Sequence, residues 1–400
     1  MCADLILLGG GHANLPLIHR IGEIVACGHR VTCVSLAPIL YYSGMGPGTL
    51  GGAYRPEEIR FPIREMVESG GGTFIEARAT HIDAENHRIA LEDGTAIVYD
   101  VLSANTGSTI APTVHVDESV VTSRSPKVFR AKPIHQMLEL RLHVKEHLAS
   151  GPLRMVVVGG GPAAVEIAAN LCRVVREGRG EGVVGDGMPV QLIAGRQLLP
   201  EFPRSAERRV VAALRELGVE LRQSERVDRT TAEGIAVSGR NEPADVVVLA
   251  TGVVPSRIFA DSGLPVGEDG SLAVNEYLHT LGHREIFGGG DCVWFMPHPL
   301  PRAGVFAVRQ GPILVHNVMA SLDHGPDALL KRFAPGGAYL LLLNLGDDTA
   351  LFWRRILGIH VAYRSESAYR LKERIDMAFM HRFGSEADRM LRRAGGSEAA

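Results

Sequence analysis

Two segments of the chain repeat one pattern of apolar and polar positions. Each begins with a short apolar run, continues through a glycine-rich turn, and then shows the three-to-four-residue spacing of a helix. A further apolar run follows, and strand, helix and strand in this order predict a βαβ unit with parallel strands. The first unit comprises residues 4–8, 12–27 and 30–35; the second comprises residues 154–158, 163–175 and 189–194.

Both units continue in the same way. Short strands with alternating apolar residues follow, and an apolar strand then ends in Thr-Gly, at Thr106-Gly107 and again at Thr251-Gly252. These four residues are candidates for cofactor binding. The chain therefore contains an imperfect internal duplication. The remaining predicted elements are strands at 73–77, 79–83, 88–91, 97–104 and 245–250, a loop rich in Tyr, Gly and Pro at 40–54, a Gly-rich break at 178–187, and helices at 133–149, 205–217 and 303–320.

The pattern changes after residue 335. A Leu-rich strand at 339–343 is followed by a turn and by a basic amphipathic helix at 366–383, and residues 384–400 are small and polar, which is typical of a disordered tail. We therefore expect an α/β protein with two Rossmann-like dinucleotide-binding domains and a small C-terminal α+β cap. The expected ranges are 1–112 with 272–333 for the first domain, 113–271 for the second, 334–383 for the cap, and 384–400 for the tail.

The amino-acid composition limits the classes of function that the sequence supports. A net charge of −3 over 400 residues gives no reason to expect a nucleic-acid partner. The five cysteines are scattered, which argues against a disulfide framework and favours a reducing, cytoplasmic location. They also lack the short spacing that a redox-active pair needs. The sixteen histidines show no metal-ligand spacing, so no metal site is expected.

The two glycine turns carry the candidate chemistry. In a dinucleotide fold the first glycine permits the tight turn, the second lets the backbone approach a pyrophosphate, and the helix N-terminus supplies N–H groups. Two such sites suggest one dinucleotide passing electrons to another; plain strand–helix packing is the alternative for either turn alone. The candidate binding residues are Gly9, Gly11, His12 and Ala13 in the first turn, and Gly159, Gly161, Pro162 and Ala163 in the second.

Three positions depart from the usual pattern. Asn14 stands at the third glycine position of the first turn, and its bulk predicts a looser contact between helix and strand. Ser35 ends the second strand of the first unit, where an acid often binds the adenosine ribose. The equivalent strand of the second unit ends without an acid and is followed by Arg196, which favours NADP or no strict preference and leaves open that this site has lost its nucleotide.

A third motif follows another apolar strand, where glycines lead to Gly290 and Asp291. An aspartate in this position can bind the hydroxyl groups of a sugar-alcohol chain. The alternative is a turn residue that caps the helix predicted at 303–320.

Together these motifs resemble the pyridine nucleotide-disulfide oxidoreductase superfamily. Within it the chain is similar to the type II NADH dehydrogenase branch and to the flavoprotein domain fused ahead of selenide, water dikinase in some bacteria. The resemblance extends to residue 383. It is carried by Gly9-Gly10-Gly11-His12, Tyr42-Ser43-Gly44-Met45, Pro47-Gly48, Leu198-Leu199-Pro200, Ala250-Thr251-Gly252, Gly290-Asp291, Arg302 to Val305, Arg309-Gln310-Gly311, Lys372 to Asp376 and Phe379 to Phe383.

The resemblance implies FAD at the first site, with Asp291 on its ribitol chain, and NADH or NADPH at the second. It places Tyr42 and Ser43 beside the isoalloxazine. It also implies that Arg309 and Gln310 lie on a helix whose dipole stabilises reduced flavin, and that Glu166 lies close to the nicotinamide. The alternatives are a solvated helix turn for Arg309 and Gln310, and a charge that merely suits a helix N-terminus for Glu166.

The implied reaction passes hydride from NAD(P)H to flavin and electrons onward to a quinone. Reduction of a small selenium or sulfur compound, and a non-catalytic FAD-binding protein, are the alternatives. The C-terminal helix carries basic residues against an apolar stripe, which predicts contact with the inner face of a membrane; a homodimer contact or packing against the hairpin at 339–354 is the alternative. The stripe consists of Leu371, Ile375, Ala378 and Phe379, and the basic residues are Arg370, Lys372, Arg374, His381 and Arg382.

Overall fold

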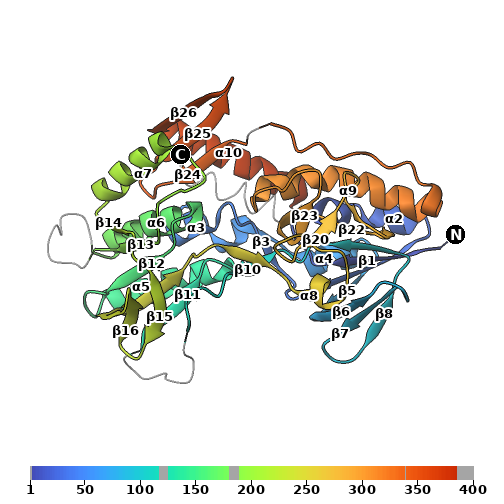
Figure 1. The fold of residues 1–400 in the computed structure, drawn as a ribbon, viewed down its shortest axis with the longest axis horizontal. Helices are drawn as coiled ribbons and strands as arrows, with labels where there is room; N and C mark the ends of the chain where they lie inside the picture. Colours follow the sequence, from blue (N-terminus) through green and yellow to red (C-terminus); the bar gives the residue numbers. More distant parts are fainter. Residues whose placement is uncertain (1, 117–124, 180–188, 338, 385–400) are drawn as a thin grey trace.

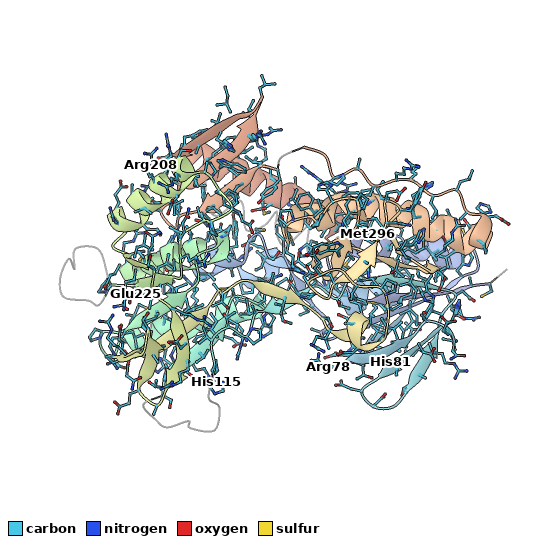
Figure 2. All side chains as sticks on the ribbon, in the orientation of Figure 1. Arg78, His81, His115, Arg208, Glu225 and Met296 are labelled. Atoms are coloured by element: carbon cyan, nitrogen blue, oxygen red, sulfur yellow. The ribbon has the colours of Figure 1, made fainter. Side chains whose placement is uncertain are left out.

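Two sheets of mainly parallel strands lie side by side and organise the protein (Figure 1). The computed structural model describes residues 2–116, 125–179, 189–337 and 339–384. The sequence predictions of a tail at 384–400 and of a Gly-rich break at 178–187 therefore fall almost entirely outside the described residues. Figure 2 shows the side chains, with Arg78 and His81 along the lower edge of the half that contains the first sheet, and His115 and Glu225 in the half that contains the second.

The first sheet draws its strands from the two ends of the predicted first domain. Most neighbouring strands pair in parallel. Two antiparallel pairs near one edge of the sheet connect the strands formed by residues 272–288. The order is β23 (Val293–Phe295), β20 (Leu272–Val274), β21 (His279–Thr280), β22 (His283–Gly288), β9 (Val101–Ala104), β1 (Asp4–Leu8), β2 (Arg30–Ser35) and β5 (Thr73–Glu76).

The second sheet is parallel throughout, and apolar residues cover both of its faces. Parallel strands buried on both sides read as continuous apolar runs, which is why the three central strands were recognisable from the sequence, whereas the more polar outer strands at 127–130 and 220–223 were missed. The order is β11 (Lys127–Arg130), β18 (Val246–Leu249), β12 (Met155–Val158), β13 (Gln191–Ala194) and β14 (Glu220–Gln223).

Small antiparallel sheets confirm the internal duplication. One three-stranded sheet precedes β9 and a second precedes β18, and a two-stranded ribbon connects the halves. The predicted single strand at 97–104 is wrong, because the chain turns at Asp100, whose carboxylate accepts the Asp4 N–H at 2.7 Å. The additional strands are β6 (Ala79–Asp83), β7 (Arg88–Leu91), β8 (Ala96–Val98), β15 (Val227–Thr231), β16 (Gly234–Val237), β17 (Arg240–Pro243), β10 (Ser108–Ile110), β19 (Val253–Pro255), β3 (Leu40–Tyr41) and β4 (Arg60–Phe61).

Helices cover the sheets, as Figure 1 shows for α9 beside the first sheet and α5, α6 and α7 around the second. The long helices lie within a few residues of their predicted ranges. The helix predicted at 12–27 is divided in two, because Arg20 leaves the helical conformation at φ −108° and ψ 12°. The helices are α1 (Leu15–Ile18), α2 (Ile21–Ala26), α3 (Gly46–Leu50), α4 (Ile63–Ser69), α5 (His135–Leu148), α6 (Pro162–Arg179), α7 (Arg204–Glu216), α8 (Ile258–Asp261) and α9 (Gly304–His324), with 3₁₀ turns η1 (Pro56–Ile59), η2 (Gly290–Cys292) and η3 (Gly325–Asp327).

Part of the segment predicted as a loop at 40–54 is the buried helix α3. Its glycines permit close approach to the second half: a Cβ on Gly51 would lie 2.1 Å from Oδ1 of Asn170 on α6. A Cβ on Gly46 would lie 2.9 Å from Cγ2 of Ile134. Gly and Pro thus serve close packing here, although they usually indicate a turn.

The C-terminal cap packs an antiparallel sheet and a long helix against the rest of the chain. No helix in the described part of the chain is both long enough and apolar enough to cross a membrane. The cap consists of β24 (Leu341–Asn344), β25 (Ala350–Ile356), β26 (Ile359–Ser365) and α10 (Glu366–Phe383), and the helix has the predicted bounds.

Asn14 does not loosen the contact between α1 and the first sheet. The side chain is fully buried, and its Nδ2 donates to the Gly9 carbonyl at 2.9 Å and to the Ser103 carbonyl at 3.0 Å. Its Oδ1 accepts the Ser103 hydroxyl at 2.7 Å. The prediction of a looser contact is therefore wrong, because hydrogen bonds replace the close approach that glycine would provide.

Asn14→Leu is expected to lower the free energy of unfolding by about 1–3 kcal/mol, because it leaves buried polar groups of Gly9 and Ser103 without partners. Urea denaturation followed by circular dichroism measures the change. Asn241→Leu, at an exposed position on β17, is the control and is expected to have little effect. Equal stability of the two variants would contradict the role of Asn14.

Candidate functional site

The first glycine turn is closed by the side chain of Asn105, the residue after β9. Oδ1 of Asn105 accepts the Ala13 N–H at 2.9 Å, and Nδ2 donates to the Gly289 carbonyl at 2.6 Å. Gly9 has a φ of +93°, and a Cβ on Gly11 would lie 2.3 Å from Asn105 Oδ1. Glycine is therefore required at both positions, once by conformation and once by space.

This arrangement changes which N–H groups can face a pyrophosphate. From the sequence we expect the N-terminus of the first helix to offer unpaired backbone N–H groups. The Ala13 and Asn14 N–H groups instead point to Asn105 Oδ1, at 2.9 and 3.4 Å. Sequence analysis missed Asn105, whose only signal is a buried polar residue at the end of an apolar strand.

His12 lies in an aromatic cluster formed by segments far apart in the sequence. Its ring centroid is 5.4 Å from that of Tyr42 and 5.9 Å from that of Phe379, and Tyr42 stacks on Phe379 at 4.9 Å. Burial, assisted by the cation of Lys132, lowers the pKa of His12 to about 4. The Nε2 atom of His12 is buried and makes no hydrogen bond within the described residues. A neutral imidazole with an unsatisfied Nε2 atom therefore lies at the first glycine turn.

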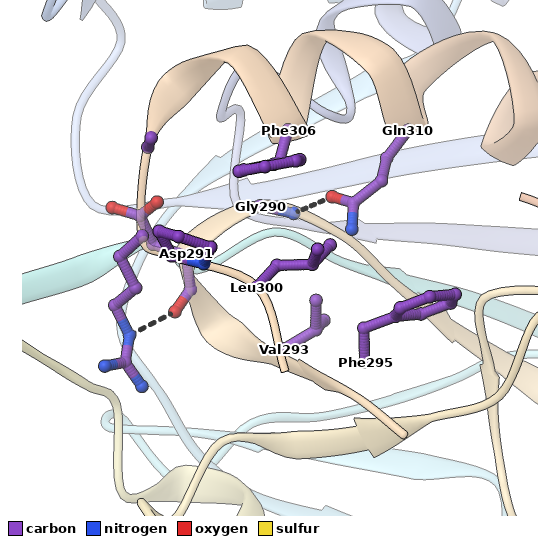
Figure 3. A pocket seen from close by; sticks show the side chains of 10 residues that line it. Gly290, Asp291, Val293, Phe295, Leu300, Phe306 and Gln310 are labelled. Atoms are coloured by element: carbon purple, nitrogen blue, oxygen red, sulfur yellow. Dashed lines mark hydrogen bonds between the residues drawn. The ribbon is translucent and has the colours of Figure 1, made fainter. Parts of the chain in front are cut away.

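The Gly290–Asp291 turn is held from α9. The Gly290 N–H donates to Gln310 Oε1 at 2.7 Å, and Nε of Arg302 donates to the Asp291 carbonyl at 3.0 Å (Figure 3). The side chains around these bonds, including Phe306, leave a cavity of ≈ 10 Å³, which has room for about one water molecule. The buried amide of Gln310 therefore fixes the turn that carries Asp291.

The Asp291 carboxylate accepts two hydrogen bonds at one oxygen. Ser108 Oγ donates to Oδ2 at 2.7 Å, and Lys132 Nζ donates to the same atom at 2.8 Å. Burial would raise the pKa of Asp291, but Lys132 and Ser108 outweigh it and hold the pKa below its usual value. Sequence analysis missed Lys132, because no local pattern connects it with a residue 159 positions away.

The second glycine turn is more open than the first. Gly159 has a φ of +147°, and a Cβ there would lie 2.2 Å from the Ala250 carbonyl oxygen, so this position requires glycine. No atom lies within 4 Å of a Cβ built on Gly161. Pro162 is the first residue of α6, which suits a helix start, and Ala163 is exposed. The N-terminus of this 18-residue helix is thus accessible to an anion.

The second strands of the two βαβ units, β2 and β13, end beside side chains of opposite charge. Arg196 follows β13 and is exposed, and within the described residues its guanidinium has no ion-pair partner. Ser35 ends β2 and pairs with Glu76 of β5. The acid that the end of β2 lacks is therefore present on the neighbouring strand, where Arg64 binds it at 2.6 Å.

Glu166 lies in the first half of α6 and faces the C-terminal cap. Its Oε1 accepts the Asn344 N–H at 2.8 Å. Burial raises the pKa of Glu166 to about 7, although Lys372 and the Asn344 N–H favour the charged form. Lys372 is buried and donates to the Gly44 carbonyl at 2.6 Å and to Asp376 Oδ2 at 2.7 Å.

The prediction for the faces of the C-terminal helix is wrong. Lys372 and Asp376 are buried, whereas Ile375 of the expected apolar stripe is 45% exposed and Ala378 is exposed. A lysine and an aspartate four positions apart neutralise each other, so this pair can line the buried face. Tyr42 extends the network, because its hydroxyl donates to Asp376 Oδ1 at 3.1 Å.

Several predicted site residues lie outside these contacts. Arg309 donates to the Pro335 carbonyl at 2.6 Å and so holds the segment that leads to the cap. Thr251 donates to the Ala111 carbonyl at 3.1 Å, and Gly252 adopts a φ of +93° in the connecting ribbon. Near the first site, Ser43 lies close to Gly304 at the start of α9, and Thr106 and Gly107 lie beside Cys292.

Comparison with known sequences identifies relatives along most of the chain. An internal alternative NAD(P)H-ubiquinone oxidoreductase of Arabidopsis thaliana is 25% identical over 84% of this chain and 71% of its own length. A demethylphylloquinone reductase of Synechocystis is 26% identical over 87% and 85% of the two chains. A type II NADH:quinone oxidoreductase of Staphylococcus saprophyticus is 22% identical over 80% and 83%.

Known structures share the fold. The sulfide:quinone oxidoreductase of Aquifex aeolicus superposes with a TM-score of 0.74 at 17% identity, covering 96% of this chain and 91% of that one. A water-forming NADH oxidase of Lactobacillus brevis, bound to NADH, superposes with a TM-score of 0.69 at 18% identity, covering 88% and 75%. Residues 3–319 match the family described as pyridine nucleotide-disulphide oxidoreductase, and the chain belongs to this family of oxidoreductases.

Proposed function

We propose that the protein uses FAD to pass electrons from NAD(P)H to a quinone. Two of the relatives are named for NAD(P)H or NADH together with a quinone, a third is named for reduction of a phylloquinone, and they support this reaction class. One observation carries the proposal: a chain of polar and aromatic contacts connects the two glycine turns. It runs from His12 on the first turn through Tyr42 and Asp376 to Lys372. The charge of Lys372 in turn acts on Glu166 of α6, the helix that follows the second turn.

The residues at the first turn fit FAD. Asn105 and Gly11 leave no room for a side chain within the turn, so the backbone itself can face a diphosphate. The buried His12 Nε2 lacks a partner, and Asp291 offers an ionised carboxylate for the ribitol hydroxyls. When bound, FAD supplies the hydride and electron transfer chemistry, and the protein supplies orientation and charge.

The residues at the second turn fit a nicotinamide dinucleotide. The open position of Gly161 and the accessible start of α6 suit a pyrophosphate. Arg196 lies where the 2′-phosphate of NADPH would be recognised, since no acid ends β13. We therefore assign Arg196, with Gly159, Gly161, Pro162 and Ala163, to this coenzyme.

Glu166 can hold a proton for the reaction, and the charge of Lys372 adjusts the pKa of Glu166. Reduction of a quinone to a quinol takes up two protons, and a carboxyl group that titrates near neutral pH can hold one of them. The buried Lys372 cation opposes the rise in the Glu166 pKa that burial causes. We assign the proton-holding role to Glu166 and a positioning role to Gln310, which contacts the Asp291 turn.

The domain ranges, the alternative acceptor, the oligomeric state and the location belong to the same proposal. We propose residues 1–112 and 272–333 as the FAD domain, 113–271 as the nucleotide domain and 334–383 as the cap; the division of strands between the two sheets supports these ranges. The likeness to the flavoprotein domain fused to selenide, water dikinase leaves a small selenium or sulfur compound as the alternative acceptor. A homodimer and a cytoplasmic location also stay predictions.

Contact with an anionic membrane surface is proposed for the β25–β26 hairpin. At its tip Leu357 is 97% and Ile359 is 68% exposed, and the preceding Arg354 and Arg355 are exposed as well. Aliphatic side chains beside cations suit the headgroup region of an anionic bilayer. The hairpin supports such contact better than α10, whose central Lys372 and Asp376 are buried.

Flavin reduction tests the proposed reaction. The protein reconstituted with FAD is expected to lose its flavin absorbance on mixing with NADPH or NADH in a stopped-flow experiment. Arg196→Glu is expected to weaken binding of NADPH by roughly 10–100-fold, because an ionic contact to the 2′-phosphate is lost, and to change NADH binding little. Arg215→Glu, at an exposed position near the end of α7, is the control.

Turnover with a soluble quinone, selenite or polysulfide then identifies the acceptor class. Failure of the protein to bind FAD would overturn the proposed function. A protein that binds FAD but is reduced by neither nucleotide would favour the non-catalytic alternative.

Glu166→Gln is expected to remove a pH dependence. In the unaltered protein the rate of flavin reoxidation by quinone should fall about tenfold per pH unit above about 7, as Glu166 loses its proton. The free energy of unfolding should also fall as pH rises from 4.5 to about 7, because the folded protein holds this proton more tightly than the unfolded chain. The glutamine variant should show neither change, whereas Glu85→Gln, at an exposed position, should retain both. An unaltered pH profile in Glu166→Gln would exclude the assigned role.

Leu357→Glu is expected to weaken binding to vesicles that contain anionic lipid by about tenfold or more, because burial of one leucine is lost and a repelled charge is added. Cosedimentation measures the bound fraction. Leu329→Glu, at a position that is 86% exposed and lies outside the hairpin, is the control. Equal binding by the two variants, or no binding by the unaltered protein, would contradict the membrane contact.

A further inference from the structure

Lys132 belongs to a closed triangle of hydrogen bonds around the Asp291 carboxylate. Its Nζ lies 2.8 Å from Ser108 Oγ and 2.8 Å from Asp291 Oδ2, and Ser108 Oγ lies 2.7 Å from the same Oδ2. The Lys132 and Asp291 side chains are only 30% and 15% exposed. A partly buried ion pair with two additional hydrogen bonds fixes orientation more firmly than an exposed pair does.

The triangle holds one carboxylate oxygen and leaves the other available. Among the residues that the structure describes, every hydrogen bond to this carboxylate ends on Oδ2. The main chain is held separately, by Arg302 at the Asp291 carbonyl. Oδ1 can therefore accept a hydrogen bond from a hydroxyl group without displacing an existing partner.

The three residues of the triangle come from three parts of the chain. Ser108 begins β10 in the connecting ribbon, Lys132 follows β11 of the second sheet, and Asp291 lies in η2 beside the first sheet. The cation that faces Asp291 is thus contributed by the half that we assign to the nucleotide. Its charge also reaches the first glycine turn, because it helps to lower the pKa of His12.

We propose that Lys132 is a positioning residue for the ribitol-binding carboxylate. With Ser108 it holds Oδ2 of Asp291 and so presents Oδ1 to a hydroxyl group of the flavin side chain. The proposal rests on the proposed function, because it takes FAD as the group that is bound. It follows that flavin affinity depends on a cation from the opposite half of the protein.

Titration of the flavin-free protein with FAD, followed by flavin fluorescence, tests the proposal. Lys132→Met is expected to weaken FAD binding about tenfold, because Asp291 loses a charge-assisted partner. Lys132→Arg is expected to restore most of the affinity. On acidification, Lys132→Met should lose affinity at a higher pH than the unaltered protein, since the cation that lowers the Asp291 pKa is absent.

A double variant distinguishes an effect through Asp291 from a general loss of structure. Lys132→Met combined with Asp291→Asn should bind FAD as weakly as Asp291→Asn alone. Lys127→Met, at an exposed position on β11 of the same segment, is the matched control and should bind as the unaltered protein does. Multiplying effects in the double variant, or equal loss in Lys127→Met, would overturn the proposal.

Ser108→Ala provides a second route if Lys132→Met does not fold. It removes the neutral donor to the same oxygen and should weaken FAD binding about threefold; unchanged affinity would contradict the proposal. Different results contradict the proposed function and the role of Lys132. An unaltered protein that does not bind FAD overturns the proposed function, whereas one that binds FAD no more tightly than Lys132→Met overturns only the role of Lys132.

Discussion

The carboxamide of Asn105 joins two loops that the rest of the site depends on. It accepts backbone N–H groups from the first glycine turn and donates to the Gly289 carbonyl beside the Asp291 turn. Both loops must come close to this side chain, and glycine at positions 11 and 290 makes that approach feasible, since a Cβ there would lie 2.3 and 2.4 Å from the amide. Two motifs that the whole second half of the fold separates in the sequence thus form one unit.

The sequence predicted the parts of the site that follow from local pattern. The apolar strands, the glycine turns and Asp291 after β22 were all recognisable, because strand burial and turn geometry leave a signature within a few residues. The duplicated order of elements then indicated two similar halves. These features leave a local signature in the sequence, although distant contacts such as those of Asn105 and Gln310 hold them in place in the fold.

Roles that arise from distant contacts were not predictable from the sequence. Asn105 and Lys132 carry no local signal, since their partners lie in other parts of the chain. Lys372 was assigned to an exposed basic face, because a lysine in an amphipathic helix is usually solvated. Its burial depends on Asp376 and on the Gly44 carbonyl, which only the folded structure brings together. The glycines of α3 led to a different error: they predicted a loop, whereas they permit close packing of a helix.

The C-terminal cap is part of the site and not an appendage. Burying Lys372 and Asp376 costs solvation free energy, which their mutual contact and the hydrogen bonds to Gly44 and Tyr42 offset. Phe379 adds an aromatic surface against Tyr42. The last helix therefore completes an environment begun by the first glycine turn, and the cap and the first half must fold together for either to be satisfied.

The two glycine turns differ in how tightly the protein itself packs against them. The first is packed against Asn105, whereas nothing lies within 4 Å of the position that a Cβ on Gly161 would take in the second. The duplicated architecture has thus diverged: one copy fixes its turn through a neighbouring carboxamide, and the other leaves the start of α6 accessible.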